Sequence, residues 1–77
     1  MSMADEKWAH AEGERVASEA LTDNDNEVEF VQRDFDGLRA TWAREIVGEE
    51  VEDISDDLFH GFDEGFHSVV PELARLS

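Results

Sequence analysis

The sequence predicts an all-α protein, a small bundle of three helices. Apolar residues recur at steps of three and four, there is no alternating strand pattern of useful length, and the chain has one Pro. Because 77 residues make one domain at most, we expect a single helical domain over residues 1–77. Disorder is expected only at the ends, in residues 1–5 and 72–77.

The first helix is expected at about residues 4–21. This segment is rich in Ala and Glu, which are good helix formers. Its large apolar residues, Trp8, Val16 and Leu21, do not share one stripe, and Gly13 interrupts the middle. We therefore expect a peripheral helix that docks mainly through Trp8 and Val16.

The second helix, at about residues 27–47, has the strongest pattern. Asn26 is positioned to cap its start and Glu29 follows at capping-box spacing, while Gly48 is a plausible stop. Phe30 lies off the apolar face. That face falls within one arc of the helix and consists of Val28, Val31, Phe35, Leu38, Trp42 and Ile46.

The third helix is expected at about residues 50–70, starting at Glu50 or at a cap near Asp53, and Pro71 should end it. Gly61 and Gly65 lie inside it, four residues apart. Each glycine costs about 1 kcal/mol relative to Ala in a helix, so we expect them to permit close approach of another helix. The alternative is a break near Gly61. The apolar face is formed by Val51, Leu58, Phe62, Val69 and Leu73.

A short turn near Gly48 joins the second and third helices, so we expect them to form an antiparallel hairpin. The first helix could cover this hairpin and complete a three-helix bundle within one chain. Because it has little apolar width, we favour the pairing of two chains as a homodimer, with the first helix outside. The residues predicted at this self-interface are Phe35, Leu38, Trp42, Leu58, Gly61, Phe62, Gly65 and Phe66.

The charge is strongly acidic, with 21 Asp and Glu against 6 Lys and Arg, for a net charge of −15. Self-repulsion opposes a compact state, and salt weakens it because the screening length falls from about 8 Å at 0.15 M to about 3 Å at 1 M. The single lysine, Lys7, and the many carboxylates resemble the composition of proteins from haloarchaea, which keep molar salt in the cytoplasm. This resemblance implies a halophilic protein and names no family.

The N-terminal residues carry neither a basic region nor an apolar run, so we expect no signal peptide. No apolar stretch approaches the length of a membrane span. A cytoplasmic location without membrane contact is therefore expected.

Two sets of residues are candidates for binding. Arg33, Arg39 and Arg44 place half of all Lys and Arg on the second helix. They are expected to pair with carboxylates of neighbouring helices, or alternatively to contact an acidic partner or a nucleic-acid backbone, although three arginines are few for nucleic acid.

His60, Asp63 and His67 stand at helical spacing and are weak candidates for a divalent metal. The two histidines lie about 10 Å apart along a helix axis, too far to share one ion without a second helix. Solvated histidines are the preferred interpretation, so no metal or other cofactor is expected.

Catalytic motifs are absent: the chain has no Cys, no Tyr, no Gly-rich phosphate loop and no supported Ser–His–Asp set. We therefore expect a non-enzymatic protein that acts through protein–protein contact, most simply a homodimeric accessory or regulatory module. The alternatives are a nucleic-acid-associated or transcription-related module that uses Arg33, Arg39 and Arg44, and a divalent-metal-binding helical protein.

Overall fold

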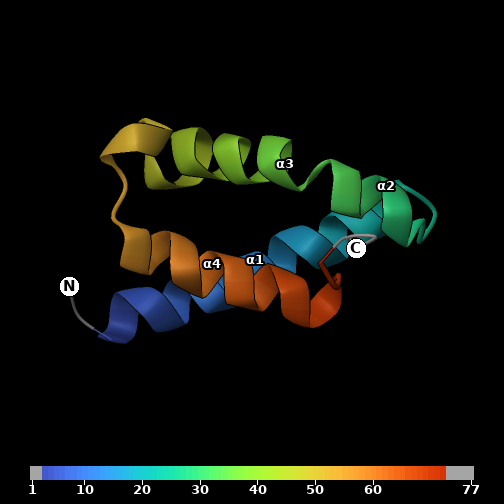
Figure 1. The fold of residues 1–77 in the computed structure, drawn as a ribbon, viewed down its shortest axis with the longest axis horizontal. Helices are drawn as coiled ribbons and strands as arrows, with labels where there is room; N and C mark the ends of the chain where they lie inside the picture. Colours follow the sequence, from blue (N-terminus) through green and yellow to red (C-terminus); the bar gives the residue numbers. More distant parts are fainter. Residues whose placement is uncertain (1–2, 73–77) are drawn as a thin grey trace, which may run out of the picture.

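The computed structural model describes residues 3–72, and this part of the chain is helical without any strand (Figure 1). The predicted all-α class is confirmed. Residues 3–5 form the start of the first helix, whereas residues 1–2 and 73–77, where disorder was also predicted, lie outside the described residues. The elements are α1 (Met3–Asp23), α2 (Val28–Arg33), α3 (Phe35–Trp42), a π-helical turn (Ala43–Val47), a 3₁₀ turn (Val51–Asp53) and α4 (Asp56–Val69).

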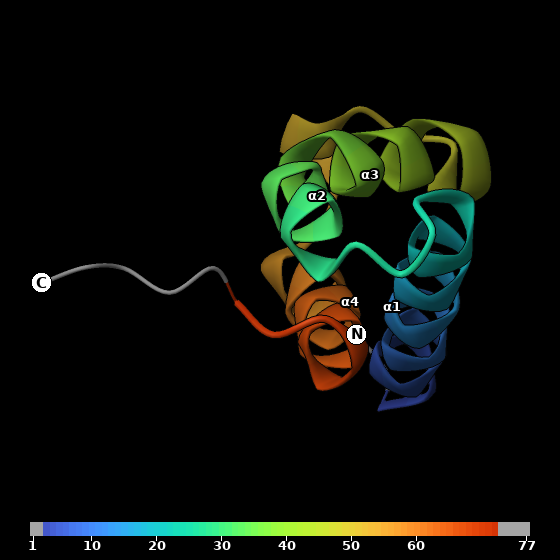
Figure 2. The ribbon, with the colours of Figure 1, turned by 90° about the vertical axis from the view of Figure 1, so that its right-hand side faces the viewer.

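The helices form two layers. α1 and α4 lie side by side and run in the same direction, while α3 crosses above them in the opposite direction (Figures 1 and 2). α3 therefore runs antiparallel to α4, the direction predicted for the hairpin. The most extensive contact between helices is that of α1 with α4.

The contact between α1 and α4 is built on glycine. A Cβ atom on Gly61 would lie 2.5 Å from the carbonyl oxygen of Glu6, and a Cβ atom on Gly65 would lie 2.7 Å from the carbonyl carbon of His10. The backbone of α1 thus occupies the space that side chains would need. The prediction that these glycines permit close helix approach is confirmed, and the approaching helix is the chain's own α1.

α1 contributes small residues to the same contact. Ala9, Gly13 and Ala17 follow each other at four-residue spacing, and all three are buried. A Cβ atom on Gly13 would lie 2.6 Å from the backbone nitrogen of Phe66. The predicted docking of a peripheral α1 mainly through Trp8 and Val16 is wrong about the main contact, which the small residues make by bringing the two backbones together. Val16 does pack against the core, and Trp8 lies 5.7 Å from Trp42 between ring centroids but stays 44% exposed. We call Gly13, Gly61 and Gly65 the glycine seam.

Aromatic side chains fill the space between α3 and the pair below it. Trp42 stacks on Phe62 with ring centroids 4.4 Å apart, and Phe35 lies 4.8 Å from Phe66. Trp42, Phe62 and Phe66 are fully or almost fully buried. One chain therefore closes an apolar core. The buried members of this core are Ala9, Ala17, Ala20, Val31, Trp42, Ala43, Ile54, Leu58, Phe59, Phe62, Phe66 and Val70.

The second predicted helix is divided at Asp34, whose backbone leaves the helical region with φ −90° and ψ 1°. The break accompanies a contact of α2 with the chain after α4, where the side chain of Gln32 donates a hydrogen bond of 2.7 Å to the carbonyl of Pro71.

The helix ends were predicted in part. Gly48 stops the π-helical turn with a left-handed φ of 81°, and α4 ends at Val69, just before Pro71. α4 is continuous through both of its glycines but starts late, at Asp56, where Ser55 caps it by accepting a hydrogen bond from the Leu58 backbone.

The capping role predicted for Asn26 is wrong. Asn26 has a left-handed φ of 64° in the turn that follows α1, and its backbone nitrogen donates to the carbonyl of Leu21. Glu27 takes the N-cap position of α2 and makes no side-chain capping bond. Asn26 therefore ends the first helix rather than starting the second.

Candidate functional site

The residues predicted at a self-interface lie in the core of the single chain. Trp42, Leu58, Phe62 and Phe66 are buried, and both glycines of α4 pack against α1. Phe35 and Leu38 are partly buried and pack against the same core. The packing of these residues within one chain leaves little of this set exposed to a partner.

A groove lined in part by apolar side chains lies between α1 and α3 with its following π-helical turn, and its volume is about 250 Å³. We call it the α1/α3 groove. It was not predicted from the sequence. Its apolar lining is Val16, Ala20, Leu38, Trp42 and Ile46, and its polar lining is Arg15, Glu19, Asp23, Thr41 and Glu45.

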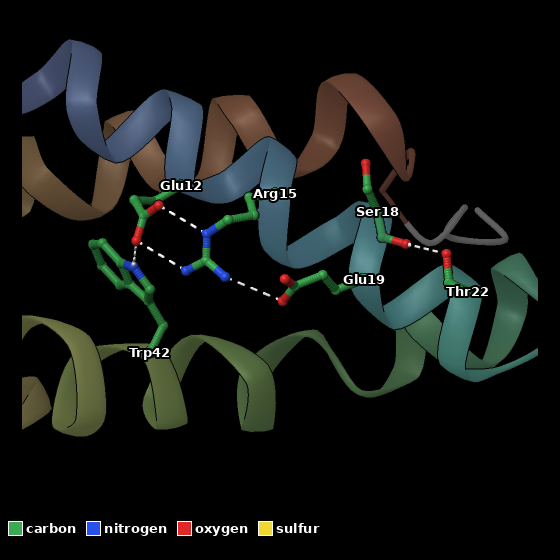
Figure 3. Close-up of polar contacts among 6 residues, drawn as sticks. All are labelled: Glu12, Arg15, Ser18, Glu19, Thr22 and Trp42. Atoms are coloured by element: carbon green, nitrogen blue, oxygen red, sulfur yellow. Dashed lines mark hydrogen bonds and ion pairs between the residues drawn. The ribbon is translucent and has the colours of Figure 1, made fainter.

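A hydrogen-bonded network borders the groove (Figure 3). Arg15 donates to both carboxylate oxygens of Glu12, at 2.9 and 3.0 Å, and to Glu19 at 3.1 Å. The indole Nε1 of Trp42 donates to Glu12 at 3.3 Å, so this carboxylate joins α1 to α3. The hydrogen bond from Arg15 lowers the pKa of Glu12 against the opposing effect of burial, and the bond from Trp42 lowers it further.

The lowered pKa of Glu12 predicts a pH dependence. A carboxyl group whose pKa is lower in the folded state stabilises that state above its unfolded pKa, about 4.3, and loses this contribution as the pH falls through the folded pKa. We expect Glu12→Gln to cost on the order of 1 kcal/mol at neutral pH, with the difference from wild type shrinking in acid. Urea unfolding of both proteins across this pH range measures it. A difference that stays constant into strong acid would contradict the assignment.

The three arginines predicted as a set do not form one surface. Arg33 pairs with Glu29 of its own helix at 2.6 Å, and Arg44 lies 3.8 Å from Glu50 across the following turn. The third, Arg39, is the member that pairs with another helix. The predicted pairing with a carboxylate of a neighbouring helix is therefore confirmed for Arg39, whereas Arg33 and Arg44 pair locally.

Arg39 lies between two features of α4. Its guanidinium carbon stands 3.9 Å from the ring centroid of Phe59, and its Nη2 donates to Asp63 at 3.1 Å. Nε lies 3.1 Å from the second carboxylate oxygen in an ion-pair contact without hydrogen-bond geometry. Burial raises the pKa of Asp63, and the charge of Arg39 opposes this rise. The pair serves as a link between helices.

We expect Arg39→Ala to lower the free energy of unfolding by about 1–2 kcal/mol, because it removes the stacked stem, the cation–π contact and the ion pair together. Arg33→Ala is the matched control, since its pair is exposed and lies within one helix, and it should change stability by less than about 0.5 kcal/mol. Urea unfolding of both variants tests this. Equal losses would show that Arg39 has no special structural role.

The candidate metal residues are separated. His60 pairs with Glu64 at 2.9 Å on the exposed side of α4. His67 lies against the ring of Phe35, 4.7 Å between centroids, and its Nδ1 is 3.1 Å from the carbonyl oxygen of Val70. Within residues 3–72, no three His, Asp or Glu side chains are grouped so that they could hold a metal ion.

No protein-family model, curated protein or solved structure matches this chain. In the described part of the chain, no helix combines the length and the apolar character that a membrane span requires.

Proposed function

We propose that this chain is a non-enzymatic, salt-adapted module that acts through protein–protein contact, and that the α1/α3 groove is its contact surface. The observation that carries the proposal is a groove in which the partly exposed apolar side chains of Val16, Leu38 and Ile46 lie above the buried Ala20 and Trp42. Ile46, at one end of this lining, is 50% exposed. Contact of apolar surface with water is unfavourable, so a partner that covers this surface gains binding free energy.

The size of the groove favours a protein partner over a small substrate. Pockets for small molecules usually measure about 300–1,000 Å³ and enclose most of the ligand. This groove is smaller, about 250 Å³, and is open along one side. It suits a few side chains of a partner's surface better than an enclosed ligand.

The acidic surface supports adaptation to concentrated salt in the cytoplasm of a halophile. All 21 Asp and Glu share one small chain with 6 Lys and Arg, and no carboxylate in the described part of the chain is among the fully buried side chains. Carboxylates that stay solvated fit a role in the protein's interaction with its solvent.

The salt adaptation predicts that helical content rises steeply as KCl increases from about 0.1 M to about 2 M, because the screening length shortens from about 10 Å to under 3 Å. Salts excluded from the protein surface also strengthen apolar burial. Circular dichroism at 222 nm measures this directly. A flat signal over that range would show that the charge serves another purpose.

The homodimer remains a prediction, but it would need a surface other than the residues first expected for it. Repulsion between two copies, each with a net charge of −15, is screened in concentrated salt, so charge does not decide between a second copy and another protein. We favour a different protein as the partner, in an accessory or regulatory role, because the residues first expected at a self-interface pack in the core of one chain. The nucleic-acid alternative is less supported, because Arg33 and Arg39 already pair with carboxylates.

A matched pair of variants tests the contact surface. Ile46→Gln removes an apolar side chain from the groove, and Phe30→Gln makes a similar change at a residue that is 60% exposed and lies outside it. In pull-downs from host lysate at native salt, we expect wild type and Phe30→Gln to retain a partner that Ile46→Gln loses. Retention by all three proteins, with unchanged circular dichroism, would refute the groove as the contact surface.

A further inference from the structure

Resting on the proposed interaction role, we propose that the α1/α3 groove binds a short amphipathic helix of another protein that carries a basic side chain near each end. Three features of the groove support this occupant: its length, the apolar side chains along it and the position of its unpaired carboxylates.

The length of the groove matches about two turns of helix. Its lining runs from Arg15 to Asp23 on α1 and from Leu38 to Ile46 on the opposite side. Each stretch advances about 12 Å at 1.5 Å per residue. Apolar side chains at steps of three and four on a partner helix would enter such a groove. Binding of the apolar face of an amphipathic helix in a hydrophobic groove is a recurring mode of recognition.

Some charged side chains at the groove have a partner of opposite charge, and others do not. Arg15 is already held by Glu12 and Glu19. Asp23 and Glu45 line the groove, yet neither makes an ion pair within residues 3–72. The groove therefore presents two carboxylates without a cation, and a basic partner would complement them.

The two carboxylates lie at opposite ends. Asp23 is the last residue of α1, and Glu45 belongs to the π-helical turn that follows α3. Because α1 and α3 run in opposite directions (Figure 1), these positions fall at the two ends of the groove. Bound side chains of Lys or Arg would be separated by about 12 Å along the groove, or roughly two helical turns.

The π-helical turn places Glu45 and Ile46 along the groove together. Such turns are rare and occur frequently at functional sites. A second copy of this chain is a poorer occupant, because each copy is acidic and its Arg33 and Arg44 already lie beside carboxylates.

The test uses synthetic amphipathic helical peptides with one apolar face and either Lys, Gln or Glu at the flanking positions. Binding to the full chain is followed by fluorescence anisotropy of the labelled peptide, in about 0.15 M and about 2 M KCl, two conditions that differ strongly in screening. We expect the Lys peptide to bind at least about tenfold more tightly than the Glu peptide. The difference in affinity between the Lys and Glu peptides should be smaller in the high-salt condition.

Charge variants of the protein identify the site. Asp23→Asn with Glu45→Gln should weaken binding of the Lys peptide at least about fivefold. Asp36→Asn with Glu52→Gln is the matched control, because it removes the same charge from residues that do not line the groove. The control pair should leave the affinity within about twofold.

Three outcomes would overturn the inference. One is equal binding of the three peptides, and another is equal weakening by the two pairs of variants. In both cases, if Ile46→Gln also lost peptide binding, the groove would still be supported as a contact surface, but its preference for a basic partner would be refuted. The third is a homodimer that Ile46→Gln dissociates while no peptide binds, which would assign the groove to a second copy.

Discussion

Gly65→Ala is expected to destabilise the fold by about 3 kcal/mol or more, at the upper end of the range for overpacking. Helix propensity alone predicts the opposite, a gain of about 1 kcal/mol. Steric contact prevails because the new methyl group would meet the backbone of α1 at the carbonyl group of His10. A backbone cannot rotate away as a flexible side chain can, so α1 and α4 would have to separate. Urea unfolding in concentrated KCl measures the loss.

Gly37→Ala is the matched control for this prediction. Gly37 lies inside α3, and a Cβ atom there would have its nearest neighbour at 3.6 Å, the side-chain oxygen of Asp34. This variant should be neutral or more stable by up to about 1 kcal/mol. If Gly65→Ala also proved neutral or stabilising, the close approach of α1 and α4 would be refuted.

Phe62→Ala is expected to lower the free energy of unfolding by about 3–5 kcal/mol, through lost apolar burial and the cavity left behind. Phe62 is fully buried and stacks on Trp42, with further contacts to the rings of Phe35 and Phe66. A domain of this length has a total stability of about 4–12 kcal/mol. The variant should therefore be largely unfolded in low salt.

Phe30→Ala is the control for the aromatic layer. Its side chain is 60% exposed, so its loss should change stability by less than about 0.5 kcal/mol. Thermal unfolding followed by circular dichroism compares the two variants. Similar midpoints for Phe62→Ala and Phe30→Ala would mean that the buried aromatic layer is not the core of the folded chain.

Much of the helical content could be predicted from the sequence because it depends on local patterns. The steps of three and four indicate α3 and α4, and Gly48 and Pro71 mark ends that backbone geometry enforces. The break at Asp34 has no such local signal. It accompanies the contact of Gln32 with the chain after α4, which depends on the tertiary structure.

The packing of α1 was predicted wrongly because the prediction considered only its large apolar side chains. Ala9, Gly13 and Ala17 bury little side chain but let two backbones meet. The signal was present as a small residue at every fourth position, matching Gly61 and Gly65 of α4. Two facing rows of small residues are better evidence of helix pairing than the width of an apolar stripe.

The groove could not be predicted because it is a product of packing. The glycine seam draws α1 toward α4, while aromatic side chains hold α3 at a greater distance, and the open side between α1 and α3 results. The network of Glu12, Arg15 and Trp42 also depends on that arrangement. The charged residues predicted from the sequence, such as Arg33, Arg39 and Arg44, were chosen from their spacing along one helix, which carries no information about contacts between helices.

We expect one chain to close its own core without pairing with a second copy. The most direct test is the midpoint of thermal unfolding in about 2 M KCl, measured over a hundredfold range of protein concentration. For a folded monomer the midpoint is independent of concentration, and this is the result we predict. A midpoint that rises steadily with concentration would show that folding is coupled to self-association and would contradict the claim.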